Sequence, residues 1–152
     1  MLHLCERVEA KPASRSETWR EGCLTLSFED RRKSRLRACL DDGREAAILL
    51  PRGTQLRDGE YLLDDAAKVA VCVKAAMETL SVVRTADLHL LVRAAYHLGN
   101  RHVPVQLGQG WLAYRHDHVL DGLVCALGLT IACEEGRFEP EAGGYAQGPH
   151  EH

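Results

Sequence analysis

The hydrophobic positions of this chain change their pattern near residue 65. Before that point, short apolar stretches recur at roughly ten-residue spacing between turn signals, which is typical of strands in a small sheet or open barrel. The turn "DDG" at 41–43 suits a hairpin, because glycine accepts a positive φ. A β-rich domain is therefore predicted over residues 1–65, with strands at 23–28, 35–40, 46–51 and the end of 57–63.

After residue 65 the pattern predicts strand, helix, strand, strand, helix, strand. Valine-rich alternation indicates a strand over 68–83, and further strands are predicted at 102–107, 111–115 and 130–135. Apolar residues at helical spacing form the expected buried stripes. These are Leu88, Leu91, Val92 and Ala95 in the first helix, and Leu120, Leu123, Val124 and Leu127 in the second. This order is that of a ferredoxin-like (βαββαβ) domain.

The expected ends of both helices follow from residues that satisfy free backbone groups. Thr85 and Asp117 are the expected N-caps, because their side-chain oxygens can accept hydrogen bonds from first-turn amides. Gly99 and Gly128 are the expected left-handed residues after the last turns.

The predicted fold class is α+β, in three segments. A β-rich domain at 1–65 precedes a ferredoxin-like domain at 66–138. Residues 139–152 are rich in Gly, Pro and Glu without an apolar stripe, so we expect a flexible, histidine-containing tail.

Composition and charge narrow the classes of partner. Apolar residues make up 45% of the chain, enough for a core, and the formal net charge is −3, so no basic excess would neutralise nucleic-acid phosphates. The basic run at 31–37 is either a solvated hairpin edge or a docking patch for an acidic partner. No apolar stretch approaches membrane-spanning length, and 1–11 lacks the pattern of a signal peptide. We expect a cytoplasmic protein with no membrane or nucleic-acid partner.

Cysteine spacing and motifs favour no catalytic chemistry. The six cysteines include no Cys-x-x-Cys pair, so neither a zinc knuckle nor a thioredoxin-type motif is present, and reduced thiols are expected. The chain also lacks Gly-x-Ser-x-Gly, a phosphate loop and His-Glu-x-x-His. We therefore expect that the protein is not an enzyme.

Histidines provide the candidate chemistry. His102 stands between a helix end and Pro104, which would fix its direction, yet a lone histidine is as compatible with a structural role as with a ligand role. His116 and His118 lie two apart at a strand–helix junction, where an extended backbone would turn both rings to one side; they are either ligands of one ion or a polar junction. His150 and His152 add two imidazoles at the end, and imidazole suits Ni, Cu and Zn.

Three stretches carry a family resemblance. "HLGNRHVPVQL" at 97–107, "YRHDHVLDGLVCALGLT" at 114–130 and "FEPEAGGYA" at 138–146 resemble, in order and spacing, the C-terminal half of the UreE family of urease accessory proteins, which are nickel metallochaperones. The likeness is specific from about 94 to 146. Over the N-terminal half it rests on a compatible β-rich pattern.

The resemblance implies a homodimer of two-domain subunits that carries Ni²⁺, with Cu²⁺ or Zn²⁺ as other ions that an imidazole set accepts. The N-terminal domain would bind peptide-like partners, and the ferredoxin-like domain would form the dimer. His102 would meet its symmetry mate across the two-fold axis, and the pair would bind Ni²⁺. His116 and His118 would form a more peripheral site, and His150 and His152 in the tail would complete the nickel site.

The expected function is delivery of Ni²⁺ to a urease accessory GTPase and the apo-urease complex, without catalysis. One alternative is a peptide-binding adaptor of the urease maturation complex, in which metal binding is incidental. Another is a small zinc or copper hydrolase, although no acid or base partner is evident around the histidines. Each imidazole must be neutral to bind a metal, so affinity should fall below about pH 6.

Overall fold

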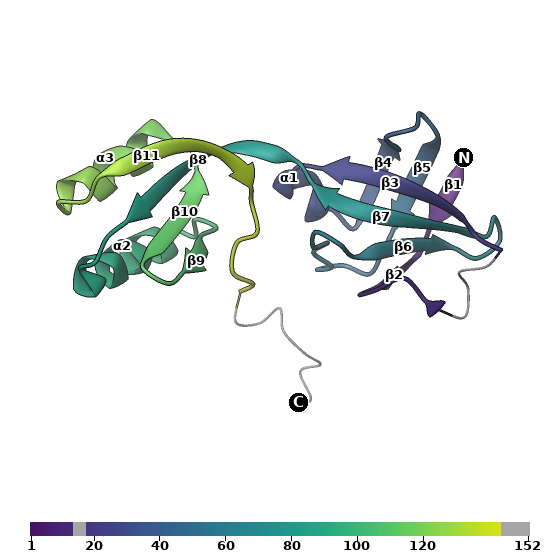
Figure 1. Cartoon of the computed structure of the whole chain (residues 1–152), viewed down its shortest axis with the longest axis horizontal. Helices are drawn as coiled ribbons and strands as arrows, with labels where there is room; N and C mark the ends of the chain where they lie inside the picture. Colours follow the sequence, from purple (N-terminus) through teal and green to yellow (C-terminus); the bar gives the residue numbers. More distant parts are fainter. Residues whose placement is uncertain (14–17, 144–152) are drawn as a thin grey trace. The chain divides into compact units, whose positions relative to one another are not determined.

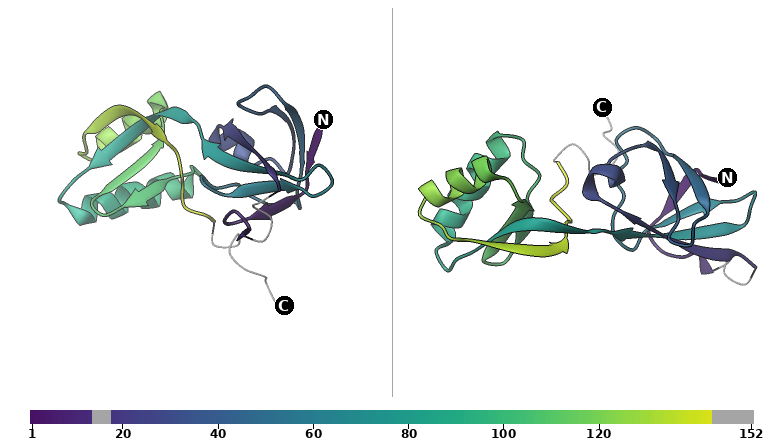
Figure 2. Two further views of the ribbon diagram at one scale, coloured as in Figure 1. Left: turned by 45° about the vertical axis from the view of Figure 1, so that its right-hand side comes forward. Right: turned by 90° about the horizontal axis from the view of Figure 1, so that it is seen from above.

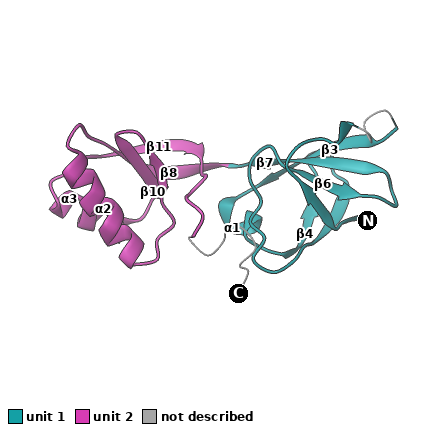
Figure 3. Ribbon diagram, turned by 90° about the horizontal axis from the view of Figure 1, so that it is seen from below, with its two compact units in different colours: residues 1–76 teal, residues 77–152 magenta. Residues whose placement is uncertain are grey.

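The computed structural model describes residues 1–13 and 18–143 and divides the chain into two compact units, Met1–Ala76 and Met77–His152 (Figures 1 and 3). Helices and strands are mixed, which confirms the predicted α+β class. Within the described residues, no helix is both long and apolar enough to cross a membrane.

The first unit contains two sheets around one apolar core. The smaller sheet has the order β1 (Leu2–Leu4), β5 (Glu45–Leu49), β4 (Arg35–Cys39). The larger has the order β2 (Glu6–Val8), β6 (Tyr61–Asp64), β7 (Val69–Ala75), β3 (Arg20–Leu26). Alternate residues of β3, β5 and β7 point into the core, as the period of two in a strand requires. The hairpin turn at 41–43 is confirmed, with Gly43 at φ +92°.

A short helix, α1 (Phe28–Arg31), stands where the sequence indicated only a turn. The Ser27 hydroxyl accepts a hydrogen bond from Asp30 N at 3.2 Å and caps it. Arg31 is buried, and its guanidinium donates to the Leu56 carbonyl at 3.3 Å while lying over the Phe28 ring. One helical turn is too short to produce the periodic signal on which sequence reading depends.

The boundary between the units lies eleven residues beyond the expected position, after Ala76 rather than Asp65. The stretch 68–83 forms two strands, β7 and β8 (Met77–Arg84), instead of one. β7 belongs to the first unit, because it pairs in parallel with β3 and antiparallel with β6. The valine-rich pattern continues across the boundary and carries no sign of which sheet each half joins.

The second unit has the predicted order of elements: β8, α2 (Leu88–Asn100), β9 (Gln106–Gly108), β10 (Trp111–Arg115), α3 (His118–Ala126) and β11 (Ile131–Arg137). Its sheet is antiparallel throughout, in the order β11-β8-β10-β9, which confirms the ferredoxin-like topology. Both helices lie on the same side of this sheet (Figure 2), and their apolar residues share one core cluster with β8 and β10.

The buried stripe of α2 differs from the predicted one. Leu91 faces the core as expected, but its buried companions are Ala94 and Leu98. Leu88 and Val92 are 63% and 66% exposed. Because α2 is apolar on more than one side, helical spacing alone does not identify the side that packs.

The helix caps agree only in part with prediction. The N-cap of α2 is Asp87, whose carboxylate accepts from Leu90 N at 3.2 Å, while the Thr85 hydroxyl accepts from Asp87 N at 3.0 Å. Asp117 caps α3 as expected, and Gly128 follows α3 with φ +96°.

Residues 139–143 were expected to belong to a flexible tail. Instead, hydrogen bonds attach them to the second unit. Glu139 N donates to the Gln106 side-chain oxygen at 3.1 Å, and Glu141 N donates to the Val105 carbonyl at 2.8 Å. Phe138 just before them is fully buried. The rest of the predicted tail, 144–152, lies outside the described residues.

A fragment of residues 1–76 should unfold cooperatively, whereas a fragment of residues 1–65 should not. The shorter fragment lacks β7, which lies between β6 and β3 and contributes three buried valines to the core. Thermal denaturation followed by circular dichroism, together with the dispersion of amide NMR signals, measures the difference. Equal behaviour of the two fragments would contradict the boundary after Ala76.

Candidate metal site

His102 occupies the left-handed position at the end of α2, which the sequence assigned to Gly99. Its φ is +56°, whereas Gly99 lies inside the helix. His102 N donates to the Gly99 carbonyl at 3.0 Å, and Val103 N donates to the Leu98 carbonyl at 3.1 Å. These two bonds form a Schellman motif, with His102 at the position that usually carries glycine.

A residue with a β-carbon in this conformation strains the backbone by roughly 1 to 2 kcal/mol. The side chain of His102 is exposed, so packing in the core does not compensate for the strain. Backbone strain of this kind concentrates at functional sites, where a particular side chain is needed. The conformation of His102 therefore points to a role for its imidazole beyond ending the helix.

His116 is held by a hydrogen-bond network that starts in the core. Its Nδ1 lies 3.0 Å from the Ser81 hydroxyl and 3.2 Å from the Asp121 carboxylate. The second oxygen of Asp121 accepts a hydrogen bond from the Tyr114 hydroxyl at 2.6 Å. Tyr114 and Ser81 are fully buried, on β10 and β8. The network fixes the ring of His116 through Nδ1.

The hydrogen-bond partners of this network favour one tautomer of the His116 imidazole. Burial, followed by the neighbouring Asp121 carboxylate, raises the pKa of Tyr114 well above its ordinary value, so its hydroxyl remains a donor. The Asp121 carboxylate can accept a hydrogen bond from Nδ1–H of His116, which favours the tautomer with a free electron pair on Nε2. A carboxylate that orients histidine in this way is typical of metal ligands.

His118 lies close to His116, as the spacing predicted. Asp117 between them is extended, with φ −155° and ψ 127°, and the two ring centroids are 5.4 Å apart. Two imidazoles on one ion, each with its nitrogen about 2.1 Å away, have centroids roughly 4.5 to 5.2 Å apart. A small rotation of the exposed His118 ring would therefore let both bind a single ion.

A hollow of about 420 Å³ joins two of the candidate ligands. Its lining includes His102 and Pro104 after α2, and Arg115 and His116 at the end of β10. His118 is not part of this lining, and His150 and His152 lie outside the described residues. Residues 1–13 and 18–143 contain no group of three or more potential ligands that could hold an ion together. Among the described residues, this hollow thus brings two candidate ligands together, His102 and His116.

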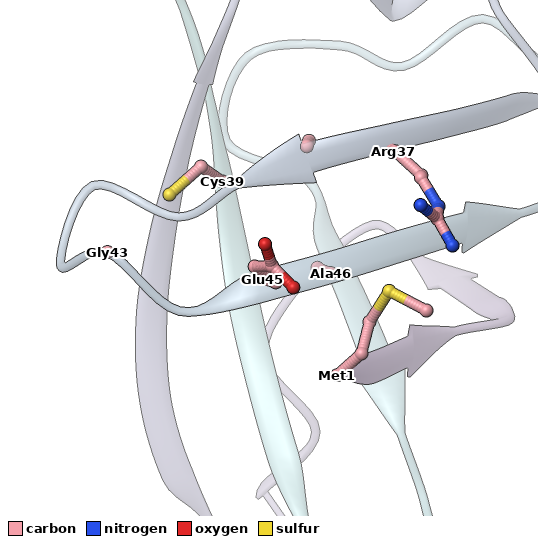
Figure 4. A pocket seen from close by; sticks show the side chains of 7 residues that line it. Met1, Arg37, Cys39, Gly43, Glu45 and Ala46 are labelled. Carbon is pink, nitrogen blue, oxygen red and sulfur yellow. The ribbon is translucent and has the colours of Figure 1, made fainter.

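The first unit has hollows of a different chemistry. One of about 680 Å³ is bordered by the cations Arg32, Lys33, Arg35 and Arg52. Of these, Lys33 is paired with Asp30 at 2.7 Å. A smaller one of about 420 Å³ is lined by Met1, Arg37 and Glu45 among others (Figure 4). The larger one presents mainly positive charge, and the smaller one is lined by side chains of both signs.

Sequence models of a known family cover nearly the whole chain. The N-terminal domain of the UreE urease accessory protein matches residues 3–75, and its C-terminal domain matches residues 78–152. The chain belongs to the UreE family. The gap between the two matches coincides with the structural boundary after Ala76.

UreE proteins of several bacteria resemble this chain over most of its length. A urease accessory protein UreE of Pseudomonas putida (strain W619) is 57% identical over 129 residues, which is 85% of this chain and 80% of that relative. One of Vibrio parahaemolyticus is 49% identical over 84% of this chain and 81% of the relative. One of Escherichia coli O157:H7 is 47% identical over 100% of this chain and 95% of the relative.

The sequence did not single out the residues that support His116 in this UreE chain. Tyr114 and His116 are two residues apart in an extended segment and therefore lie on the same face. Asp121 lies one turn into the next helix. A tyrosine two residues before a histidine, with an acidic residue one helical turn after the cap, is the signal that could have found them. Ser81 comes from a distant strand, and only the pairing of β8 with β10 brings it near.

Replacing His102 with glycine should stabilise the fold, because glycine adopts a positive φ without strain. We expect His102→Gly to raise the free energy of unfolding by about 1 kcal/mol, measured by urea denaturation without metal. The matched control is Gly128→Ala at the end of α3, where an added β-carbon meets no atom within 4 Å. It should lower the free energy of unfolding by about 1 kcal/mol. Destabilisation by His102→Gly would contradict the strain assigned to His102.

Proposed function

We propose that this protein is a nickel-binding metallochaperone of the cytoplasm, which delivers Ni²⁺ for assembly of the urease active site and catalyses no reaction. Membership of the UreE family supports a role in urease maturation. The observation that carries the proposal is the exposed imidazole of His102, kept in a backbone conformation that glycine would adopt with less strain.

The tightest nickel site forms, in this proposal, when two copies of the chain bring their His102 side chains to one ion. A two-fold dimer presents the same surface on both subunits. Helix α2, which ends two residues before His102, has an apolar row at successive turns, Leu88, Val92 and Tyr96, with Tyr96 62% exposed. Val119 on α3 is 70% exposed. Exposed apolar rows of this kind support a dimer contact through the second unit.

His116 and His118 form the second, peripheral site for Ni²⁺, or for Cu²⁺ or Zn²⁺. The Asp121 contact to Nδ1 supports Nε2 of His116 as the ligand atom. His150 and His152 supply two further imidazoles that complete the nickel site and later leave it. Few fixed ligands suit delivery, because an ion with open positions can pass by ligand exchange to a urease accessory GTPase and then to the apo-urease complex.

Native mass spectrometry with a nickel titration tests the proposal. The unaltered protein should be a dimer whose tightest-bound Ni²⁺ is lost in His102→Ala. The control is His89→Ala, which removes another exposed histidine from the same helix. Retention of that ion in His102→Ala would assign a structural role to His102 and exclude the two-fold site.

Asp121→Asn should weaken binding of the ion that depends on His116, because an amide orients the imidazole less strongly than a carboxylate. Loss of such a supporting group reduces metal affinity by about 10- to 100-fold. Isothermal titration calorimetry measures this change, with Asp42→Asn in the first unit as the control. An unchanged affinity, with circular dichroism showing an intact fold, would contradict the supporting role of Asp121.

A second candidate is a peptide-binding adaptor in which metal is incidental. The basic hollow beside β4 and β5 favours it, since Arg35 and Arg52 could receive an acidic segment of a partner. The two functions differ in a cell-based assay of urease activation. A metallochaperone loses activation with His102→Ala, whereas an adaptor retains it and loses activation with the double substitution Arg35→Glu and Arg52→Glu.

A further inference from the structure

Two cysteines and a tyrosine form a row across the larger sheet of the first unit. Cys23 on β3 is the register partner of Cys72 on β7, and Cys72 is in turn the partner of Tyr61 on β6. All three side chains are partly buried, while the residues after Cys23 and Cys72 point into the core. The row therefore lies on the outer face of the sheet. We propose that Cys23 and Cys72 form a binding site for one soft, thiophilic cation of the Cu(I) class.

The register places the two thiols at a suitable spacing for one ion. Neighbouring strands lie about 4.8 Å apart, and directly paired residues project from the same face. Both cysteines are free thiols. At this spacing, one ion can lie between the two thiolate sulfur atoms, and the backbone does not have to move.

The site is accessible through a hollow of about 600 Å³ that both cysteines line. Lys74 and Tyr61 border it, together with the turn at 41–42. Lys74 follows Cys72 by two residues on the same strand, so it projects from the same face of the sheet as the thiols. An ion from solution can thus reach the sulfur atoms directly.

Carboxylates near this hollow are already engaged. Both oxygens of Asp41 accept from Thr25, at 3.0 Å from its amide and 2.9 Å from its hydroxyl. Asp42 is paired with Arg44 at 2.7 Å, and hydrogen bonds from Arg44 hold the pKa of that carboxyl below its ordinary value. Glu21 is paired with Lys11. The ligands left for an ion are therefore sulfur atoms, which harder divalent ions do not prefer.

The number of ligands selects the class of ion. The described residues contain no larger cluster of histidine, cysteine and carboxylate side chains around this pair. Structural zinc sites in proteins use four protein ligands, whereas two thiolates in a line complete the coordination of Cu(I). Tyr61 is the register partner of Cys72 and lines the same hollow, so its hydroxyl can donate a hydrogen bond to a bound thiolate.

This site differs in chemistry from the histidines of the second unit and does not rest on the proposed function. Thiolates attract soft ions, and imidazoles attract nickel, copper and zinc. One chain would then bind a soft ion at a place separate from its candidate histidine ligands.

The test is a Cu(I) competition titration against a chromogenic Cu(I) chelator, without oxygen and with a reductant that contains no thiol. A variant with serine at Cys5, Cys39, Cys125 and Cys133, the four exposed cysteines, keeps only the pair. It should bind one Cu(I) per chain. Adding Cys23→Ser should weaken this binding at least 100-fold, and Cys72→Ser should do the same.

The reciprocal variant keeps the four exposed cysteines and carries Cys23→Ser and Cys72→Ser. It should lose the tight Cu(I) and bind Ni²⁺ as the unaltered chain does. Cys23 lies on an edge strand, so Cys23→Ser alone keeps the test valid if Cys72→Ser disturbs the fold. Tight Cu(I) binding by the reciprocal variant, or failure of the four-serine variant to bind Cu(I), would overturn the proposal.

Discussion

The left-handed backbone at His102 is the constraint on which the candidate site depends. A helix must satisfy its last carbonyl groups, and α2 does so with two bonds that require one residue at positive φ. Glycine serves this purpose at the end of α3, and histidine serves it at the end of α2. The same turn that ends the helix therefore sets the position of an exposed imidazole at the hollow that His116 also lines.

A second constraint acts on His116 from the core. Asp121 links the ring to the buried Tyr114, and Ser81 contacts the same ring nitrogen. Packing of α3 on the sheet thus determines the orientation of a side chain at the surface. His118 has no comparable support among the described residues. One candidate ligand is fixed by its backbone, one by hydrogen bonds, and one only by its place in sequence.

Sequence periodicity was sufficient to predict the order of elements in the second unit. Each of its six segments shows either the alternation of a strand or the apolar spacing of a helix. Periodicity was insufficient at several places, for identifiable reasons. The boundary at Ala76 is hidden in a continuous valine-rich stretch, although β7 and β8 join different sheets. The stripe of α2 was misjudged because Leu88 and Val92 look as suitable for a core as Ala94 and Leu98. The left-handed conformation was predicted for Gly99 instead of His102, because glycine is much more common than histidine at a positive φ. The candidate pair His116 and His118 could be read from spacing, but Ser81 is brought to it only by strand pairing.

The central claim is that the imidazole of His102 binds nickel, and X-ray absorption at the nickel K-edge tests it most directly. Protein loaded with one Ni²⁺ per two chains would be compared with His102→Gly loaded in the same way. The account predicts that scattering from imidazole rings decreases in His102→Gly, although this variant folds at least as stably as the unaltered chain. An unchanged spectrum would show that His102 is not a ligand and would contradict the account.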